Sequence, residues 1–227
     1  MEHISNLLKD IAYKNGKDGQ VVFTDFLDYV IDCFSMERLI KDNGNYKSIF
    51  EKIKNEDSAF FPAFSELVMK SPNVIKENNI YDFFGNIYEI MFQSGRKAAN
   101  LGQFFTPQSL SNLCSHISCE GFEGFEGEVF INEPTCGSGR NLLSVFSENK
   151  DKAQYYIAED IDNVSVKMCA INMMLHGMRG CCICHNTLFP SDFIFGYEVN
   201  EVRYPFPTEY YSIRNIEKNE YTKRFVR

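Results

Sequence analysis

Two acidic side chains and a glycine turn are the residues of this chain best suited to chemistry. Glu133 ends a short apolar segment, residues 129–133, and Gly137-Ser138-Gly139 follows closely. Asp160 follows a second such segment, residues 154–158. A strand, a glycine-rich turn and a helix place backbone N–H groups at one edge of a sheet, and glycines let a ligand approach the backbone. The pattern predicts a site for a small cofactor.

The chemistry of this site favours a nucleoside cofactor without phosphates. Asp160 lies about twenty residues beyond the glycine turn, where dinucleotide-binding folds place a carboxylate on ribose hydroxyls. However, the turn lacks the third glycine of a pyrophosphate site, and no lysine follows it as in a P-loop. Glu133 would repel a phosphate and attract an ammonium group. S-adenosylmethionine (SAM) has a ribose, an ammonium group and no phosphate, so it fits better than NAD. The alternative to a cofactor contact is that Asp160 only caps the end of its strand at the surface.

A second group of potentially reactive residues is the run Cys181-Cys182-Ile183-Cys184-His185. It formally matches C-x-x-C-H, the pattern of covalent haem attachment. That chemistry needs an exported protein, and the first residues lack a signal-peptide pattern. A zinc site usually needs two spaced pairs of ligands, and the sequence has no second C-x-x-C. We therefore expect neither haem nor zinc, and instead a buried strand of small apolar side chains.

The elements that must position these residues alternate along the chain. Residues 154–158 are typical of a strand, residues 163–174 of a helix, and residues 181–184 of a further strand. Strand–helix–strand repeats predict a parallel sheet with right-handed crossovers. Ligands of such sheets bind at the carboxyl ends of the strands, which are residues 133–139, 160–162 and 185–187.

The preceding part of the chain predicts helices. Apolar residues recur at intervals of three and four, most clearly from Phe23 to Phe34. The many aromatic residues there favour a hydrophobic core over a ligand site, and Pro72 is expected to end a helix. The polar, glycine-bounded stretch 95–102 suggests a boundary. The expected domains are a helical domain (1–97), a cofactor-binding domain (98–196) and a partly ordered C-terminal extension (197–227).

Composition restricts the class of protein. The chain has 227 residues, 44% hydrophobic and 24% charged, as in soluble globular proteins. Its apolar runs are too short to span a bilayer, so we expect a cytoplasmic protein. The formal charge of −8 argues against electrostatic binding of nucleic acid by the whole surface, but leaves a local basic groove or a basic partner open. Residues 197–227 mix aromatic and basic side chains, which can bind single strands, although a tail packed on the sheet is favoured.

Four segments resemble the adenine-N6 DNA methyltransferases, specifically the modification subunits of type I restriction systems. They are Asp-Phe-Phe-Gly-Asn-Ile-Tyr-Glu at 82–89, Gly-Gln-Phe-Phe-Thr-Pro at 102–107, Glu-Pro-Thr-Cys-Gly-Ser-Gly at 133–139, and Ala-Glu-Asp-Ile-Asp at 158–162 followed by Asn-Met-Met-Leu-His-Gly at 172–177. The resemblance covers residues 80 to 190 in the family's order and spacing. It implies a Rossmann-like SAM-dependent methyltransferase core, an α/β fold with a parallel, incomplete sheet, preceded by a helical domain.

The resemblance also implies residue roles. Phe105, Thr106 and Pro107 would line the methionine end of SAM, and Glu133 would interact with its amino group. The turn under the cofactor would be formed by Cys136, Gly137 and Gly139. Asp160 would bind the ribose hydroxyls, and Ile161 would pack on the adenine. Asn186 stands where the family has an aspartate that binds the adenine amino group; its amide carbonyl can accept the same hydrogen bond without the charge.

One motif of the family is missing. The catalytic loop, Asn-Pro-Pro-Phe or Asn-Pro-Pro-Tyr after the fourth strand, holds the flipped base and accepts hydrogen bonds from its amino group. No proline of this chain follows an asparagine and no two prolines are adjacent, so the catalytic residues are unknown. Three hypotheses stay open: a DNA adenine methyltransferase whose missing parts come from a specificity or other partner subunit, a non-catalytic SAM-binding or structural module, and a methyltransferase that acts on RNA or protein.

Overall fold

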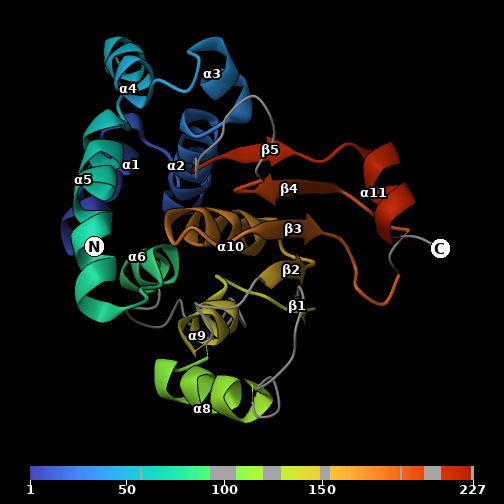
Figure 1. The fold of residues 1–227 in the computed structure, drawn as a ribbon. Helices are drawn as coiled ribbons and strands as arrows, with labels where there is room; N and C mark the ends of the chain where they lie inside the picture. The colour runs from blue at the N-terminus through green and yellow to red at the C-terminus, as the bar shows by residue number, and fades with distance from the viewer. Residues whose placement is uncertain are drawn as a thin grey trace. The chain divides into compact units, whose positions relative to one another are not determined.

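A computed structural model describes residues 1–56, 58–92, 106–119, 129–148, 154–189, 191–201 and 211–225 (Figure 1). The helices are α1 (Glu2–Asn15), α2 (Gly19–Cys33), α3 (Met36–Lys41), α4 (Tyr46–Asn55), α5 (Phe61–Asn78), α6 (Phe83–Phe92), α8 (Gln108–Cys119), α9 (Arg140–Glu148), α10 (Asn163–Leu175) and α11 (Lys218–Phe225). The strands are β1 (Val129–Glu133), β2 (Gln154–Asp160), β3 (Gly180–Cys184), β4 (Phe195–Val199) and β5 (Ile213–Asn215).

The chain divides into two compact units, Met1–Phe104 and Phe105–Arg227. The described part of the first unit is helical, α1 to α6, as the sequence predicts. Its aromatic residues form the core: Phe23 is buried and its ring lies 6.4 Å from that of Phe84 and 5.7 Å from that of Tyr88. The prediction that these aromatics are core residues is therefore confirmed.

The prediction for Pro72 is wrong, because this proline lies inside α5. A proline in a helix removes the N–H that would bond to the carbonyl four residues earlier, here that of Val68. The Ser71 hydroxyl lies 3.5 Å from this carbonyl and supplies a long substitute hydrogen bond. A neighbouring side chain thus offsets part of the loss, and the helix continues to Asn78.

The second unit is built on a five-stranded sheet in the order β1-β2-β3-β4-β5. β1, β2 and β3 are parallel, as predicted, with Glu133 beside Ala158 and Asp160 beside Cys184. β4 is antiparallel to β3 and β5 is antiparallel to β4, an arrangement that the sequence did not predict. Only ten residues, 185–194, link β3 to β4. A parallel return needs a crossover of about a dozen residues or more, so this short link makes β4 run back along β3.

Different helices cover the two faces of the sheet: α9 and α10 cover one face and α11 packs on the other (Figure 1). Tyr156 and Cys182 point towards α9 and α10, where they contact Phe146 and Met173. The preceding residue of each strand, Tyr155 and Cys181, points to the other face and packs in a cluster with Tyr221 of α11. β3 is buried throughout, which confirms that Cys181–Cys184 form a buried strand.

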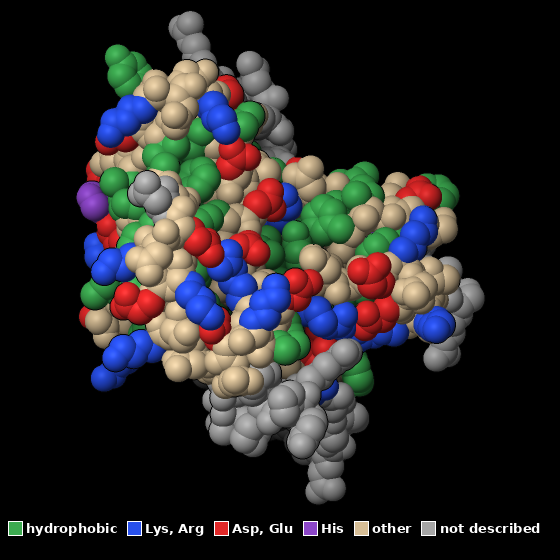
Figure 2. Space-filling model, turned by 90° about the horizontal axis from the view of Figure 1, so that it is seen from above, with side chains coloured by type: hydrophobic (Ala, Val, Ile, Leu, Met, Phe, Trp, Pro, Cys, Tyr) green, Lys and Arg blue, Asp and Glu red, His purple; other side chains and the backbone are tan. Residues whose placement is uncertain are grey.

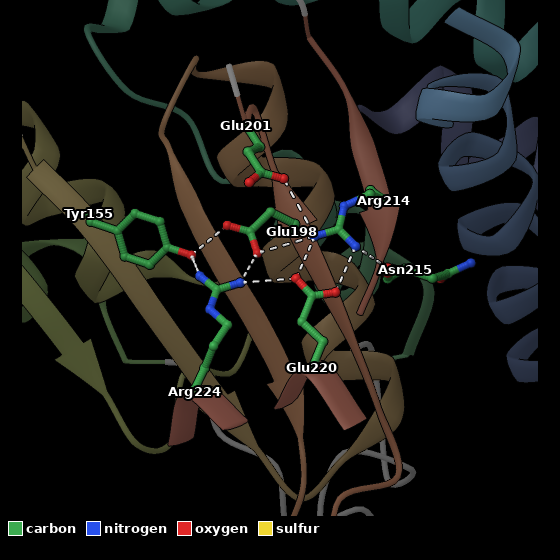
Figure 3. A network of polar contacts seen from close by, with 7 residues as sticks. All are labelled: Tyr155, Glu198, Glu201, Arg214, Asn215, Glu220 and Arg224. Carbon is green, nitrogen blue, oxygen red and sulfur yellow. Dashed lines mark hydrogen bonds and ion pairs between the residues drawn. The ribbon is translucent and has the colours of Figure 1, made fainter. Parts of the chain in front are cut away.

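The C-terminal part of the chain is joined to this sheet. Residue 196, where the sequence suggests the end of the cofactor domain, lies within β4, and the other expected boundary, at residue 97, lies outside the described residues. Arg214 of β5 and Arg224 of α11 form ion pairs with Glu198, Glu201 and Glu220 (Figure 3). These two basic side chains are therefore engaged within the unit, in agreement with a tail that packs on the sheet.

The surface carries charges of both signs. On the face seen in Figure 2, acidic and basic side chains are interspersed over the described residues, without a large area of one sign. No helix in the described part of the chain is long and apolar enough to cross a bilayer.

Candidate cofactor site

The glycine turn after β1 requires glycine at two positions. Gly137 and Gly139 have φ angles of +53° and +92°, in the left-handed region that side chains disfavour. A Cβ atom at Gly139 would also lie 2.8 Å from Sγ of Cys169 in α10. The turn therefore packs closely on α10, and the buried amide of Asn172 donates to the Ser138 carbonyl at 2.9 Å.

Asp160 connects this turn to the carboxyl end of β2. One carboxylate oxygen accepts a hydrogen bond from the Gly137 N–H at 2.9 Å, and the other accepts from the Asp162 N–H at 2.9 Å. The backbone adds a further link, since Cys136 N–H donates to the Glu159 carbonyl at 2.8 Å. A carboxylate offers about four acceptor positions, so Asp160 keeps acceptor capacity for a ligand.

Glu133 lies at the carboxyl end of β1 and is half-buried. It accepts hydrogen bonds from the Thr135 hydroxyl at 3.2 Å and from the Asn141 amide at 3.2 Å. The other end of that amide, Asn141 Oδ1, is buried and has no hydrogen-bond donor among the described residues. Asn141 thus orients the Glu133 carboxylate, an acceptor that suits a cationic N–H group. Sequence reasoning did not single out Asn141; its place directly after the turn was the available signal.

The residues ahead of α8 reach the same region through Arg140. This side chain is nine-tenths buried and donates from Nη1 to the Thr106 carbonyl at 2.9 Å. Thr106 and Pro107 immediately precede α8, as expected from their helix-start pattern, whereas Phe105 lies outside the described residues. Arg140 is a second residue that sequence reasoning missed, because a buried arginine at a helix start has no distinctive sequence pattern.

The segment after β3 completes the edge. Asn186 Oδ1 accepts from the Leu188 N–H at 3.1 Å, which leaves one lone pair of its carbonyl for another donor. The Thr187 hydroxyl donates to the Pro134 carbonyl at 2.9 Å and so ties this segment to the glycine turn. Ile161 is 67% exposed beside Asp160 and offers an apolar surface.

The structure thus brings Glu133, the glycine turn, Asp160, Ile161 and Asn186 to one edge of the sheet, because the parallel strands β1, β2 and β3 all end there. Cys136 lies under the turn as an inert thiol. A hydrogen bond with Cys169, together with burial, raises its pKa well above the usual value for a cysteine. It therefore stays protonated and does not act as a nucleophile.

β4 leads the chain away from this edge. Val199, its last residue, pairs with Gly180, the first residue of β3, so β4 ends at the opposite edge. There Asn200 adopts a left-handed φ of +52° and donates its side-chain amide to the Met178 carbonyl at 2.9 Å. Its side-chain carbonyl accepts from the Ser212 N–H at 3.1 Å. Asn200 is therefore a structural residue that closes the loop after α10.

The fold and the edge define an α/β protein whose glycine turn and acidic strand ends lie where open sheets bind nucleoside ligands. The model of the N-6 DNA Methylase family matches residues 79–226, more than half of the chain. The chain belongs to this family.

Known proteins with similar sequences include two methylase subunits. The type I restriction enzyme MpnII methylase subunit of Mycoplasma pneumoniae is 32% identical over 107 residues, which are 45% of this chain and 19% of that protein. The type I restriction enzyme EcoEI methylase subunit of Escherichia coli is 29% identical over 126 residues, 47% of this chain and 24% of that protein. The chain thus spans about a fifth to a quarter of these relatives.

Among solved structures, a type I restriction-modification methyltransferase subunit from Streptococcus thermophilus is similar with a TM-score of 0.36 and 14% identity. The similarity covers 78% of this chain and 54% of that one. A TM-score this low does not establish a shared arrangement of the elements.

Proposed function

We propose that this chain binds SAM at the carboxyl edge of β1, β2 and β3. The observation that carries the proposal is the link between Asp160 and the Gly137 N–H, which joins an acidic strand end to a glycine turn. That combination suits a ribose, whose hydroxyls donate to a carboxylate beside a glycine turn. Membership of the N-6 DNA Methylase family supports SAM over other nucleosides.

The donor and acceptor groups present fit this cofactor. Glu133, oriented by the Asn141 amide, would hold the ammonium group, Asp160 the ribose, and the Asn186 carbonyl the adenine amino group. Ile161 would cover the adenine, and Phe105, Thr106 and Pro107 would line the methionine end. Cys136, Gly137 and Gly139 would form the turn beneath it. When bound, SAM supplies an electrophilic methyl group.

The family favours adenine in DNA as the methyl acceptor over RNA or protein. Methylation of a base also needs polar acceptors that hold its amino group beside the methyl donor. In this family those acceptors follow the fourth strand. The fourth strand along this chain, β4, is antiparallel to β3 and ends at the opposite edge, where the Asn200 side chain bonds to the backbone of Met178 and Ser212. We therefore propose a SAM-binding module that is inactive by itself. The acceptors and further DNA contacts would have to come from outside these residues, for example from a partner subunit. A cytoplasmic location remains a prediction.

Calorimetric titration with SAM tests the cofactor site with a matched pair of variants. Asp160→Asn removes the charge and one acceptor oxygen, while Asp162→Asn changes a carboxylate two residues away that serves as the N-cap of α10. Asparagine caps helices about as well as aspartate. We expect the SAM Kd to rise about tenfold or more in Asp160→Asn, since hydrogen bonds to charged groups are strong, and to stay within about twofold in Asp162→Asn. Equal affinities of the two variants would refute the role of Asp160.

A further inference from the structure

His185 joins two of the proposed cofactor contacts. Its backbone N–H donates to the Asp160 carbonyl at 3.0 Å, and Asn186 is the next residue in the chain. The imidazole itself is only 1% exposed. Because side chains alternate along strands, His185 and Glu159 lie on the face covered by α11, while Asp160 faces the glycine turn.

Both nitrogens of the buried ring are hydrogen-bonded. Nε2 lies 2.8 Å from Glu159 Oε1, and Nδ1 lies 2.9 Å from the hydroxyl of Tyr221. An ionised carboxylate only accepts, so Nε2 carries a hydrogen; in the neutral ring, Nδ1 then accepts from the tyrosine hydroxyl. Burial, with a smaller contribution from Glu159, raises the pKa of Tyr221, so the phenol keeps the proton that it donates.

Tyr221 is held firmly in α11. Its ring stacks on Phe193 at 4.4 Å and on Phe225 at 5.4 Å between ring centroids. α11 is also anchored at a separate point, the network in Figure 3. There Arg224 donates to the buried Glu198 at 2.6 Å and to the Tyr155 hydroxyl at 2.9 Å. Among the described residues, the helix thus has two separate polar attachments to the sheet, of which the one through Tyr221 reaches the carboxyl edge.

We infer that His185 is a positioning residue for the proposed SAM site, and that the Tyr221 hydroxyl of α11 orients it. The inference rests on the proposed function. Glu159 and Tyr221 fix the imidazole from two sides, and the imidazole fixes the end of β3, from which Asn186 and the bond to Asp160 extend. The C-terminal helix thereby determines the geometry of an edge that it does not contribute residues to.

Two tyrosine-to-phenylalanine variants separate this role from a general attachment of α11. Tyr221→Phe removes the hydrogen bond to His185, whereas Tyr155→Phe removes hydrogen bonds to Glu198 and Arg224 at the start of β2. We expect the SAM Kd to rise about 2- to 10-fold in Tyr221→Phe, as for loss of one hydrogen bond. In Tyr155→Phe it should stay within about twofold. Both are titrated well below the temperature at which either variant unfolds.

Amide hydrogen exchange of the ligand-free protein supplies a second measurement. The His185 N–H, which bonds to Asp160, should exchange several-fold faster in Tyr221→Phe and at the wild-type rate in Tyr155→Phe.

Conservative and non-conservative substitutions of His185 supply a third measurement. His185→Gln can still donate to Glu159, while His185→Leu cannot, so SAM affinity should fall in the order wild type, His185→Gln, His185→Leu.

The outcomes distinguish this inference from the proposed function. If the wild type binds SAM, Asp160→Asn weakens binding and Tyr221→Phe does not, the role of His185 is refuted while the cofactor site stands. If both tyrosine variants weaken binding equally, α11 acts only as a structural support, which also refutes it. If the wild type does not bind SAM, the proposed function fails and the inference fails with it.

Discussion

Single residues at the carboxyl edge of β1, β2 and β3 stabilise the local structure, besides any contact with a ligand. The distance of Asp160 from the glycine turn predicts a ribose-binding carboxylate. The structure shows that this carboxylate accepts a hydrogen bond from the Gly137 N–H and so holds the turn. The two readings of the sequence, ribose contact and local capping, are therefore compatible. Gly139 is constrained even more tightly, since both its φ of +92° and the closeness of Cys169 exclude a side chain.

Substitution of Gly139 tests this packing. Gly139→Ala should lower the free energy of unfolding by about 2 kcal/mol or more, because it adds strain at a positive φ to a clash with Cys169. Gly177→Ala is the control, with a φ of +70° but no atom closer than 3.9 Å, and should cost about 1 kcal/mol. Chemical denaturation measures both. Adding Cys169→Ala should recover part of the stability lost in Gly139→Ala, and none of that lost in Gly177→Ala. Equal losses in the two glycine variants would show that the contact between residue 139 and Cys169 is unimportant.

At the scale of elements, α11 is attached to the sheet by charge as well as by apolar packing. Glu198 is 2% exposed, and it meets Arg224 at 2.6 Å and the Tyr155 hydroxyl at 2.5 Å (Figure 3). A buried carboxylate is costly unless it is paired. The interleaved aromatic and basic residues of this part of the sequence are thus explained, at Arg214, Tyr221 and Arg224, by contacts within the unit.

Arg224→Met should lower the free energy of unfolding by about 2 kcal/mol, because it leaves Glu198 buried with weaker partners. Lys223→Met, an exposed position one residue earlier on the same helix, should change it by less than about 0.5 kcal/mol. Chemical denaturation measures the free energy of unfolding of both variants. The double variant with Glu198→Gln should be more stable than Arg224→Met alone; no difference between the Arg224 and Lys223 variants would contradict a stabilising role of the ion pair.

At the scale of the whole molecule, the direction of β4 is the feature from which we propose that this chain does not methylate a base by itself. The residues of the proposed cofactor site gather where β1 to β3 end, and the chain then returns along β3 to the other edge. The charges do not form a DNA-binding area on the face in Figure 2, and the net charge is −8. Binding of a strongly anionic substrate by this chain alone is disfavoured.

The purified chain should therefore form no N6-methyladenine in unmethylated DNA incubated with SAM. Mass spectrometry of the digested nucleosides measures the product, and an active adenine-N6 methyltransferase under the same conditions shows that the assay works. Product above the blank that Asp160→Asn abolishes would overturn the proposal of an inactive module.

The sequence by itself determined the helical first unit, the parallel order of β1 to β3 and the residues gathered at their ends. These follow from local periodicity, from glycines at positive φ, and from the rule that parallel strands end at one edge. Only the tertiary structure decided that Pro72 lies within a helix, that Arg140, Asn141 and His185 bond to residues of the proposed site, and that β4 runs antiparallel to β3. The Pro72 helix depends on a local side-chain contact of Ser71, and the others depend on tertiary contacts or on the short link after β3; none of these leaves a periodic pattern in the chain.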